Sequence, residues 1–242
     1  MGVGDQSLGQ EGDAAAPGDE GGAAGRSRRL REPLSRERIE IAALALIERE
    51  GLAAFSIRKL GQVLGCEAMS IYHYFPSKSH IMDALVDHII AEMFPIAPAD
   101  LPWEERLRRT ARQWRDLLKK RPSLFTFVAT HRLNTRLGLR WINEMLKMCA
   151  AAGLTREQTV RMFRTFGYYL NGAILDETAG YARGPSTVEP VPDDEVARDY
   201  PEVIAAGPYF RESEWDKTFD FGVELLIEGY ARLAKENRRH PA

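Results

Sequence analysis

Cysteine is scarce in this chain of 242 residues. The only two cysteines, Cys66 and Cys149, lie far apart, and the sequence has no CxxC motif and no histidine cluster. These absences exclude a disulfide framework and the usual zinc sites. We expect two reduced thiols in a reducing cytoplasm, with no metal and no cofactor.

Long apolar runs are missing as well. No stretch reaches the roughly 18 apolar residues that a membrane-spanning helix needs, and the N-terminus has no apolar run typical of a signal peptide. We therefore expect a soluble cytoplasmic protein without a membrane partner.

A nucleophile motif such as G-x-S-x-G is also absent. His131 and Asp176 could suggest acid–base chemistry, but isolated polar residues in helices are more often structural. We expect that the protein is not an enzyme.

Apolar residues make up 44% of the chain, which is ample for a core, while charge is unevenly distributed. The overall net charge is −2, yet residues 26–82 carry ten Lys/Arg against six Asp/Glu. The first 25 residues carry five acids and no base, and residues 185–220 are strongly acidic. A locally basic N-terminal domain on an acidic body is what a DNA-binding protein requires.

Residues 56–75 predict two short helices joined by a tight turn. Ser56 is expected to cap the first helix, and Gly65 to end it. The apolar stripe of this helix comprises Leu60, Val63 and Leu64. In the second helix, residues 68–74, Ile71 and the Tyr74/Phe75 pair should face inward, and Met69, Ser70, Tyr72 and His73 outward.

The spacing of Gly61, Gly65 and Ile71 is typical of a DNA-binding helix-turn-helix, whose second helix enters a groove about 12 Å wide. The alternative is an ordinary helical hairpin within an all-α core. The outward side chains favour DNA binding, because an ordinary hairpin would more often expose Glu and Lys there.

Residues 1–30 are expected to form a disordered tail, because they are rich in Gly, Ala, Asp and Glu and poor in large apolar residues. Residues 25–31 form a basic arm at its end. Either this arm reaches DNA phosphates or the minor groove, or it is a solvated charge run without a specific role.

Two further helices complete a predicted DNA-binding domain over residues 34–94. Ser35 should cap the first, which Gly51 ends and which packs across the helix-turn-helix. Ser77 should cap a long helix that runs from Lys78 toward Phe94 and links the DNA-binding unit to the rest of the protein. Residues 95–102 are proline-rich and mark the expected domain boundary.

The remaining chain, residues 103–236, reads as a second helical domain. Helices are predicted at 103–120, 123–130, 137–152, 156–181, 201–206 and 214–235. Residues 183–200 should form a long mobile loop, because they hold three prolines, five acids and few apolar residues. The predicted fold class is all-α, with no strand and no repeat.

The last helix has apolar residues over more than half of its circumference, whereas a surface helix needs only a narrower stripe. We expect a homodimer interface formed with the helix of residues 155–181, where Gly172 and Ala173 would let a partner approach. The alternative is a central helix buried within one subunit.

The N-terminal pattern resembles the TetR family of transcriptional regulators. The resemblance covers residues 35–85 and rests on residues 34–37 (LSRE), 58–65 (RKLGQVLG), 71–75 (IYHYF) and Lys78. The C-terminal part resembles the tetracycline-repressor subclass through Trp103, residues 168–177 and residues 221–230. Together they imply an all-α homodimer that binds double-stranded operator DNA and holds a small-molecule effector in a C-terminal ligand-binding and dimerisation domain.

The family resemblance also implies site residues. Its DNA contacts fall on Ser56, Arg58, Ala68, Met69, Ser70, Tyr72, His73 and Lys78. Its pocket positions fall on Phe94, Thr110, Trp114, Phe127, Ile142, Met145, Phe163, Tyr168 and Asp176.

Two pocket positions differ from those of a tetracycline repressor. The imidazole that holds a magnesium–drug chelate corresponds to Phe127, whose ring offers a metal no lone pair, and the assisting glutamate corresponds to Asp176. We therefore expect a largely apolar, aromatic effector with one or two polar groups instead of a tetracycline–magnesium complex.

The sequence thus predicts a ligand-responsive repressor that binds a near-palindromic operator as a homodimer. One alternative is an activator or co-repressor-dependent regulator of the same fold, with the opposite ligand effect. A more remote alternative is a helical small-molecule enzyme whose helix-turn-helix is accidental.

Overall fold

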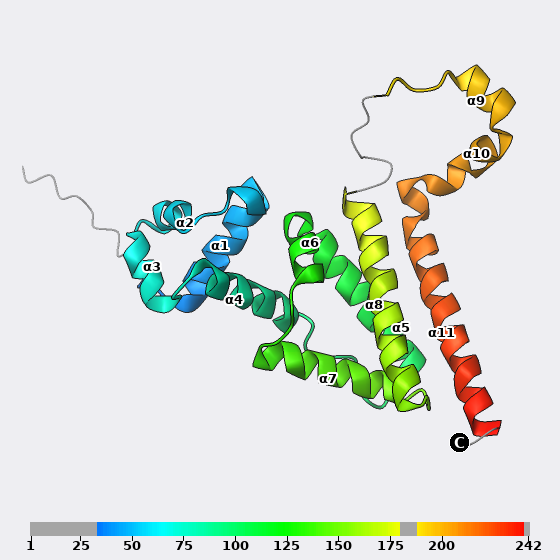
Figure 1. The fold of residues 1–242 in the computed structure, drawn as a ribbon, viewed down its shortest axis with the longest axis horizontal. Helices are drawn as coiled ribbons and strands as arrows, with labels where there is room; N and C mark the ends of the chain where they lie inside the picture. Colours follow the sequence, from blue (N-terminus) through cyan, green and yellow to red (C-terminus); the bar gives the residue numbers. More distant parts are fainter. Residues whose placement is uncertain (1–32, 180–187, 240–242) are drawn as a thin grey trace, which may run out of the picture. The chain divides into compact units, whose positions relative to one another are not determined.

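The computed structural model describes residues 33–179 and 188–239, and these residues contain helices and no strand (Figure 1). The predicted fold class, all-α, is therefore confirmed. The α-helices are α1 (Arg36–Glu50), α2 (Ile57–Leu64), α3 (Ala68–Tyr74), α4 (Lys78–Ala91), α5 (Trp103–Lys119), α6 (Pro122–Thr130), α7 (Arg136–Ala150), α8 (Arg156–Ala179), α9 (Asp193–Asp199), α10 (Pro201–Ala206) and α11 (Trp215–Arg239). Short 3₁₀ turns lie at Leu52–Ala54, Gly207–Phe210 and Glu212–Glu214.

Three serines start the helices of the N-terminal unit, as predicted. The hydroxyl of Ser35 accepts a hydrogen bond from the Arg38 backbone N–H at 3.1 Å. Ser56 and Ser77 cap α2 and α4 in the same way, over 3.3 and 3.4 Å. Each cap satisfies a backbone donor that has no partner inside the helix, so the sequence fixes where these helices begin.

The turn between α2 and α3 depends on two glycines. Gly65 ends α2 in the left-handed region at φ 68°, which costs a residue with a side chain more than it costs glycine. Gly61 lies so close to the turn that a Cβ there would stand 2.8 Å from the Cys66 carbonyl oxygen. Glycine is therefore required at this position by a close approach to the backbone of the turn.

Burial of one face sets the angle of α3. Ile71 and Phe75 are fully buried, as is Leu60 of α2, and Leu64 of α2 is nearly so. The predicted stripe of α2 was wrong at Val63, which is 48% exposed because it points away from α1 and α3.

Helix α4 ends earlier than predicted, at Ala91, and Phe94 follows it in a turn. Pro95 accounts for this end, because the residue before a proline is disfavoured in helical conformation.

In the C-terminal part, α8 packs against α5, α6, α7 and α11. Thr155 and Gln158 form a capping box at its start: the Thr155 N–H donates to Gln158 Oε1 and the Gln158 N–H to Thr155 Oγ1. The predicted end of this helix near residue 181 lies outside the described residues.

The loop predicted for residues 183–200 is wrong over its second half, where α9 forms. Pro192 precedes α9, and three acids occupy its first turn. Acidic side chains favour a helix start because they interact with its unpaired N–H groups and dipole. Residues 180–187 lie outside the described part of the chain.

An ion-pair network joins α5, α8 and α11, with the side chains of Arg115 and Glu177 buried and that of Asp216 exposed. The Arg115 guanidinium lies 2.9 Å from Glu177 and 2.8 Å from Asp216, and Lys119 lies 2.8 Å from Glu177. The Arg115–Glu177 pair holds α5 and α8 together, because removing Glu177 would leave the buried guanidinium group with only the exposed Asp216 as a counter-charge.

The described residues from Leu34 onward form one compact unit, and one hydrophobic core runs from α1 to α11. The predicted division at residues 95–102 therefore stays a prediction, and the predicted tail of residues 1–30 lies outside the described residues. Within the described ranges, the helices lack the combination of length and apolarity that a membrane crossing needs.

Replacing Gly61 with alanine should destabilise the protein by about 1–3 kcal/mol, because the new methyl group meets backbone that cannot rotate away. The measurement is the free energy of unfolding from chemical denaturation at fixed protein concentration.

Gly167→Ala is the matched control, since a Cβ there meets no described atom within 4 Å. Removing glycine from this helix interior should stabilise the protein by about 0.5–1 kcal/mol. Equal effects of the two substitutions would contradict the close approach at Gly61.

Candidate DNA-binding surface and ligand cavity

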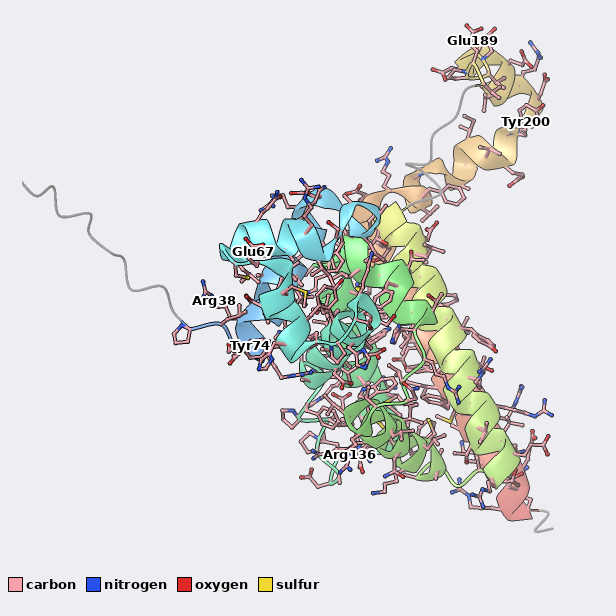
Figure 2. All side chains as sticks on the ribbon, turned by 60° about the vertical axis from the view of Figure 1, so that its left-hand side comes forward. Arg38, Glu67, Tyr74, Arg136, Glu189 and Tyr200 are labelled. Carbon is pink, nitrogen blue, oxygen red and sulfur yellow. The ribbon has the colours of Figure 1, made fainter. Side chains whose placement is uncertain are left out.

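The outward face of α3 carries the side chains predicted to contact DNA. Glu67 and Tyr74 mark the two ends of this short helix (Figure 2). Met69 is 74% exposed, and Ser70, Tyr72 and His73 are exposed as well. Large apolar and aromatic side chains on a polar surface need an explanation, and base or sugar contact is one.

A shallow groove lies between α2 and α3. It is lined by the predicted contacts Arg58, Ala68 and Ser70, and by Gln62 and Glu67, which the sequence analysis did not identify. Gln62 follows Arg58 by four residues, so both lie on one face of α2. This spacing could have identified Gln62 as a contact from the sequence. The Glu67 carboxylate would repel phosphates but suits the amino group of a cytosine.

Two predicted contacts also hold the local structure. The Lys78 ammonium group donates to the Phe55 carbonyl oxygen at 3.0 Å and lies 5.3 Å from the centre of the Phe55 ring. The Ser56 hydroxyl is the cap of α2. Lys78 has further N–H donors, and it stands at the first residue of α4, where backbone N–H groups also favour an anion.

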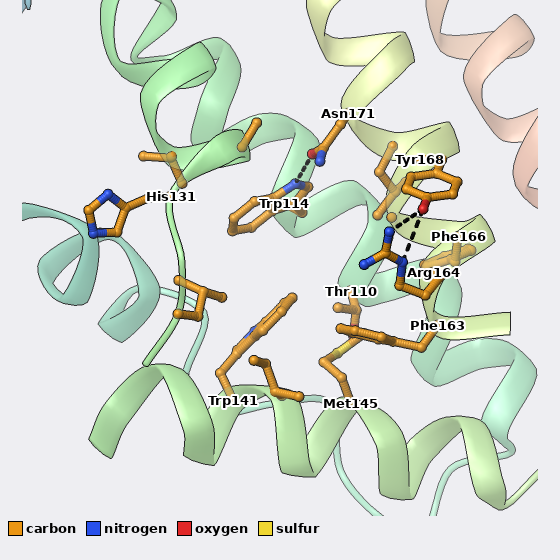
Figure 3. A pocket seen from close by; sticks show the side chains of 16 residues that line it. Thr110, Trp114, His131, Trp141, Met145, Phe163, Arg164, Phe166, Tyr168 and Asn171 are labelled. Carbon is orange, nitrogen blue, oxygen red and sulfur yellow. Dashed lines mark hydrogen bonds between the residues drawn. The ribbon is translucent and has the colours of Figure 1, made fainter. Parts of the chain in front are cut away.

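A cavity of about 400 Å³ lies among α5, α7, α8 and the chain after α6 (Figure 3). Six of the nine predicted pocket residues line it: Thr110, Trp114, Ile142, Met145, Phe163 and Tyr168. A cavity of this size with mostly apolar walls is typical of a small-molecule site.

The structure places the other three predicted residues away from this cavity. Phe94 lies against the Arg140 guanidinium, 4.9 Å from the ring centre, and Asp176 is exposed on α8. Phe127 packs on the ring of His131 at 4.7 Å, and His131 lines the cavity in its place. His131 stands about one helical turn beyond Phe127, and the correspondence of Phe127 to the imidazole of a tetracycline repressor stays a prediction.

Aromatic rings form much of the cavity wall. Trp114 and Trp141 stack with their ring centres 5.7 Å apart, and Trp141 meets Phe163 edge-on at 6.4 Å. The Trp114 indole N–H donates to Asn171 Oδ1 at 3.3 Å. Trp141 and Asn171 were missed, since helical periodicity does not distinguish a core ring from a cavity ring.

Two polar atoms in the wall are buried without a hydrogen-bond partner among the described residues: the Thr110 hydroxyl and the Trp141 indole nitrogen. A buried polar group left unpaired costs about 1–3 kcal/mol. A packed core rarely tolerates two such atoms close together, so their position at one cavity distinguishes this region from ordinary core packing.

His131 and the residues after it connect the cavity to α4. The His131 imidazole Nε2 lies 2.8 Å from Asp83 Oδ1, and the Thr135 hydroxyl donates to Asp87 Oδ1 at 2.5 Å. Asp83 and Asp87 stand one turn apart on α4, the helix that begins beside the DNA-binding surface. Within the described ranges, no group of three or more His, Cys, Asp or Glu is arranged to hold a metal ion.

Both cysteines are free thiols. Burial raises the pKa of Cys149 to about 12, because a thiolate would lose its hydration there. This thiol stays protonated and unreactive at neutral pH.

Two domain families match the chain. Residues 41–85 match the bacterial regulatory proteins of the tetR family, and residues 94–233 match the tetracyclin repressor-like C-terminal domain. The tetracycline repressor protein class A from transposon 1721 of Escherichia coli is 30% identical over 211 residues, which cover 83% of this chain and 93% of that repressor.

Solved structures show the same fold. A possible TetR family transcriptional regulator from Streptomyces coelicolor A3(2) gives a TM-score of 0.67 at 25% identity, covering 81% of this chain and 98% of that one. ActR of Streptomyces coelicolor, in complex with actinorhodin, gives 0.68 at 21% identity over 84% and 99% of the two chains. These relatives are regulators, in agreement with the expectation that the protein is not an enzyme. Because both halves of the chain match, in the same order along the sequence, the chain belongs to the TetR family of transcriptional regulators.

Proposed function

We propose that the protein is a transcriptional repressor that binds a near-palindromic operator as a homodimer and is released by a small, largely apolar effector. The observation that carries the proposal is the position of α4, which starts close to α3 and bonds through Asp83 to His131 of the cavity wall and through Asp87 to Thr135, a few residues further along. One helix thus contacts both the DNA-binding unit and the ligand cavity.

At the operator, the two kinds of contact have different roles. Arg58, Tyr72 and Lys78 suit phosphate groups, which dominate affinity and fix the register. Ala68 and Met69 suit the methyl groups of thymine in the major groove. Two copies of α3 in a dimer would read half-sites about 34 Å apart.

The first test is selection of bound duplexes from a random DNA pool at near-physiological salt. We expect an enriched palindrome. Tyr72→Ala should then weaken binding to all sequences, whereas Met69→Ala should alter preference at one base pair by about 1–3 kcal/mol.

Leu139→Ala is the control, because Leu139 is an exposed residue of α7 outside the α3 face. If both α3 variants bind the selected operator like this control, α3 is not the reading helix.

The dimer is proposed from apolar side chains left exposed on two neighbouring helices. Tyr168 and Leu175 of α8 and Phe221 and Leu225 of α11 are all exposed. At Gly172 of α8, an added Cβ would meet no described atom within 4 Å, so a second chain has room to approach. Burial of these residues against a second copy would remove a large apolar patch from water.

Leu225→Glu should therefore break the dimer and lower operator affinity, because the carboxylate would be buried in an apolar interface. Leu225 is the residue to change: the neighbouring Leu226, although apolar, packs on the core of its own chain. Sedimentation would measure the oligomeric state.

Leu139→Glu is the matched control for this test too, since Leu139 is 56% exposed and Leu225 53%. A dimer that survives Leu225→Glu would rule out this interface.

Release by the effector is proposed to act through the contacts of His131 and Thr135 with α4. A ligand changes operator affinity only through its different affinities for the two conformations. If cavity occupancy moves the chain after α6, these polar contacts carry the displacement to Asp83 and Asp87, and from there to α3.

Asp83→Asn should weaken this coupling while leaving operator affinity without effector nearly unchanged. For a compound that releases the wild-type protein, the ratio of operator affinities without and with compound should fall at least about fivefold. Fluorescence anisotropy of labelled operator measures the operator affinity without and with the compound.

Asp100→Asn is the control, since Asp100 is exposed in the turn before α5. An unchanged ratio in Asp83→Asn would exclude this route. A compound that strengthens operator binding would instead identify the co-repressor-dependent alternative.

A further inference from the structure

The basic character of the DNA-binding unit comes largely from residues that precede α1. Residues 33–82 carry six Lys/Arg against five Asp/Glu and are therefore almost neutral. The basic arm of residues 25–31 contains no acid and four arginines: Arg26, Arg28, Arg29 and Arg31. Phosphate contacts dominate the affinity of DNA-binding proteins, so an almost neutral unit needs a further source of positive charge.

The helices around the DNA-binding surface offer little charge of their own. Helix α3 contains no Lys or Arg. The Glu50 carboxylate lies 2.9 Å from the Lys59 ammonium group and 2.8 Å from the Arg49 guanidinium group. Part of the positive charge of α1 and α2 is therefore offset within the protein, and the arm is the nearest concentration of arginine along the chain.

The structure places the start of α1 at the C-terminal end of α3. The Tyr74 hydroxyl donates to the Leu34 carbonyl oxygen at 2.7 Å, and Arg36 Nη1 donates to the Tyr74 carbonyl oxygen at 2.6 Å. The Arg36 guanidinium group also lies 4.1 Å from the centre of the Phe75 ring, which is fully buried. The basic arm ends three residues before Leu34, so it connects to the protein at this end of the DNA-binding helix.

The length of the arm is sufficient to reach a second groove. An extended chain spans about 3.3 Å per residue, so residues 26–31 cover about 20 Å. With α3 in a major groove about 12 Å wide, this length suffices to cross the bordering phosphate backbone into the adjacent minor groove. A narrow minor groove has an enhanced negative potential, which attracts arginine side chains inserted into it.

We propose that the arginines of the basic arm enter the minor groove next to each operator half-site, and that the bonds among Leu34, Arg36 and Tyr74 position the arm. This inference rests on the proposed function, because it adds a second DNA contact to that of α3. Helix α3 contacts base edges in the major groove, whereas the arm responds to the width of the minor groove. The base pairs beside each half-site should therefore be rich in A·T, which narrows that groove.

The first test combines Arg28→Gln, Arg29→Gln and Arg31→Gln in one full-length variant. Affinity for the selected operator should fall at least about tenfold at near-physiological salt. The slope of log affinity against log salt concentration should become shallower by at least about 2, because a dimer has two arms and each lost phosphate contact removes about 0.9. Fluorescence anisotropy of labelled operator at several salt concentrations measures the affinity and the slope.

The matched control combines Arg232→Gln, Arg238→Gln and Arg239→Gln, which remove three charges from exposed positions of α11. Its operator affinity should change less than about twofold, because charges that do not contact DNA are screened over about 8–10 Å. An equal loss of affinity in the two variants would indicate a general effect of net charge and would overturn the proposal.

Hydroxyl-radical footprinting locates the arm on the DNA, because the radical attacks the sugars from the minor groove. The wild-type chain should protect a stretch beside each half-site, and the arm variant should lose this protection alone. Placing G·C pairs in that stretch should weaken wild-type binding about three- to tenfold, since the guanine amino group stands in the minor groove. Inosine·cytosine pairs lack this amino group and should leave binding unchanged.

Tyr74→Phe tests the positioning role, because it removes the hydroxyl bonded to Leu34 and keeps the ring. It should lower operator affinity about threefold and weaken the protection beside the half-sites. In the arm variant the same substitution should have almost no effect, because the contact that it positions is already lost. An equal loss in both backgrounds would show that the hydroxyl only supports α3, and would overturn the positioning role.

Failure of this inference is distinguishable from failure of the proposed function. If the wild-type chain selects no operator from the random pool, the function and the arm contact are both wrong. If it selects a palindrome that the arm variant binds equally well, the repressor function stands and the arm contact is overturned. Equal binding to operators with G·C and inosine·cytosine flanks would reduce the arm to phosphate contacts and overturn the minor-groove assignment.

Discussion

The burial of α4 is the constraint on which the rest of the structure depends. Ile81, Leu85, Ile89 and Ile90 of this helix are fully buried in the core that continues from α1 to α11. A core packed at crystal-like density has little free volume, so a displacement at one end of a buried helix must be accommodated at the other. Asp83 of this helix bonds to His131 of the cavity wall, and Asp87 bonds to Thr135 in the same connecting segment. Helix α4 is therefore both rigidly packed and bonded to the cavity wall, as a helix that couples the ligand cavity to the DNA-binding surface must be.

Much of the fold followed from the sequence because the deciding interactions are local. A serine cap bonds to a backbone N–H only a few residues ahead, so Ser35, Ser56 and Ser77 identified three helix starts without any tertiary information. Gly61 and Gly65 likewise determined the turn. The outward face of α3 followed from the same reasoning, since once Ile71 is inward the helical period fixes which side chains point out.

The parts that sequence reasoning missed depend on contacts between distant segments. Val63 and Leu226 are apolar residues of amphipathic helices, and only the packing partner decides that the first is exposed while the second joins the core. At the end of α6, a shift of one helical turn decides whether Phe127 or His131 faces the cavity. An unpaired Trp141 nitrogen is invisible in a sequence, because it is defined by what its neighbours fail to offer. Helical periodicity identifies the apolar face of a helix, but it does not identify what packs against that face.

The free energy of an unpaired buried polar group in the cavity wall can be compared with the free energy that regulation requires. An unpaired buried polar group costs about 1–3 kcal/mol, and the coupling between two allosteric sites typically amounts to about 1–3 kcal/mol. Satisfying one such atom in only one conformation therefore supplies a free energy of the size that regulation needs. Apolar contact contributes to affinity in both conformations, and equal affinity for both shifts no population. An effector that binds better in one conformation of the cavity wall would shift the population toward that conformation, and the contacts of His131 and Thr135 would carry the change to α4.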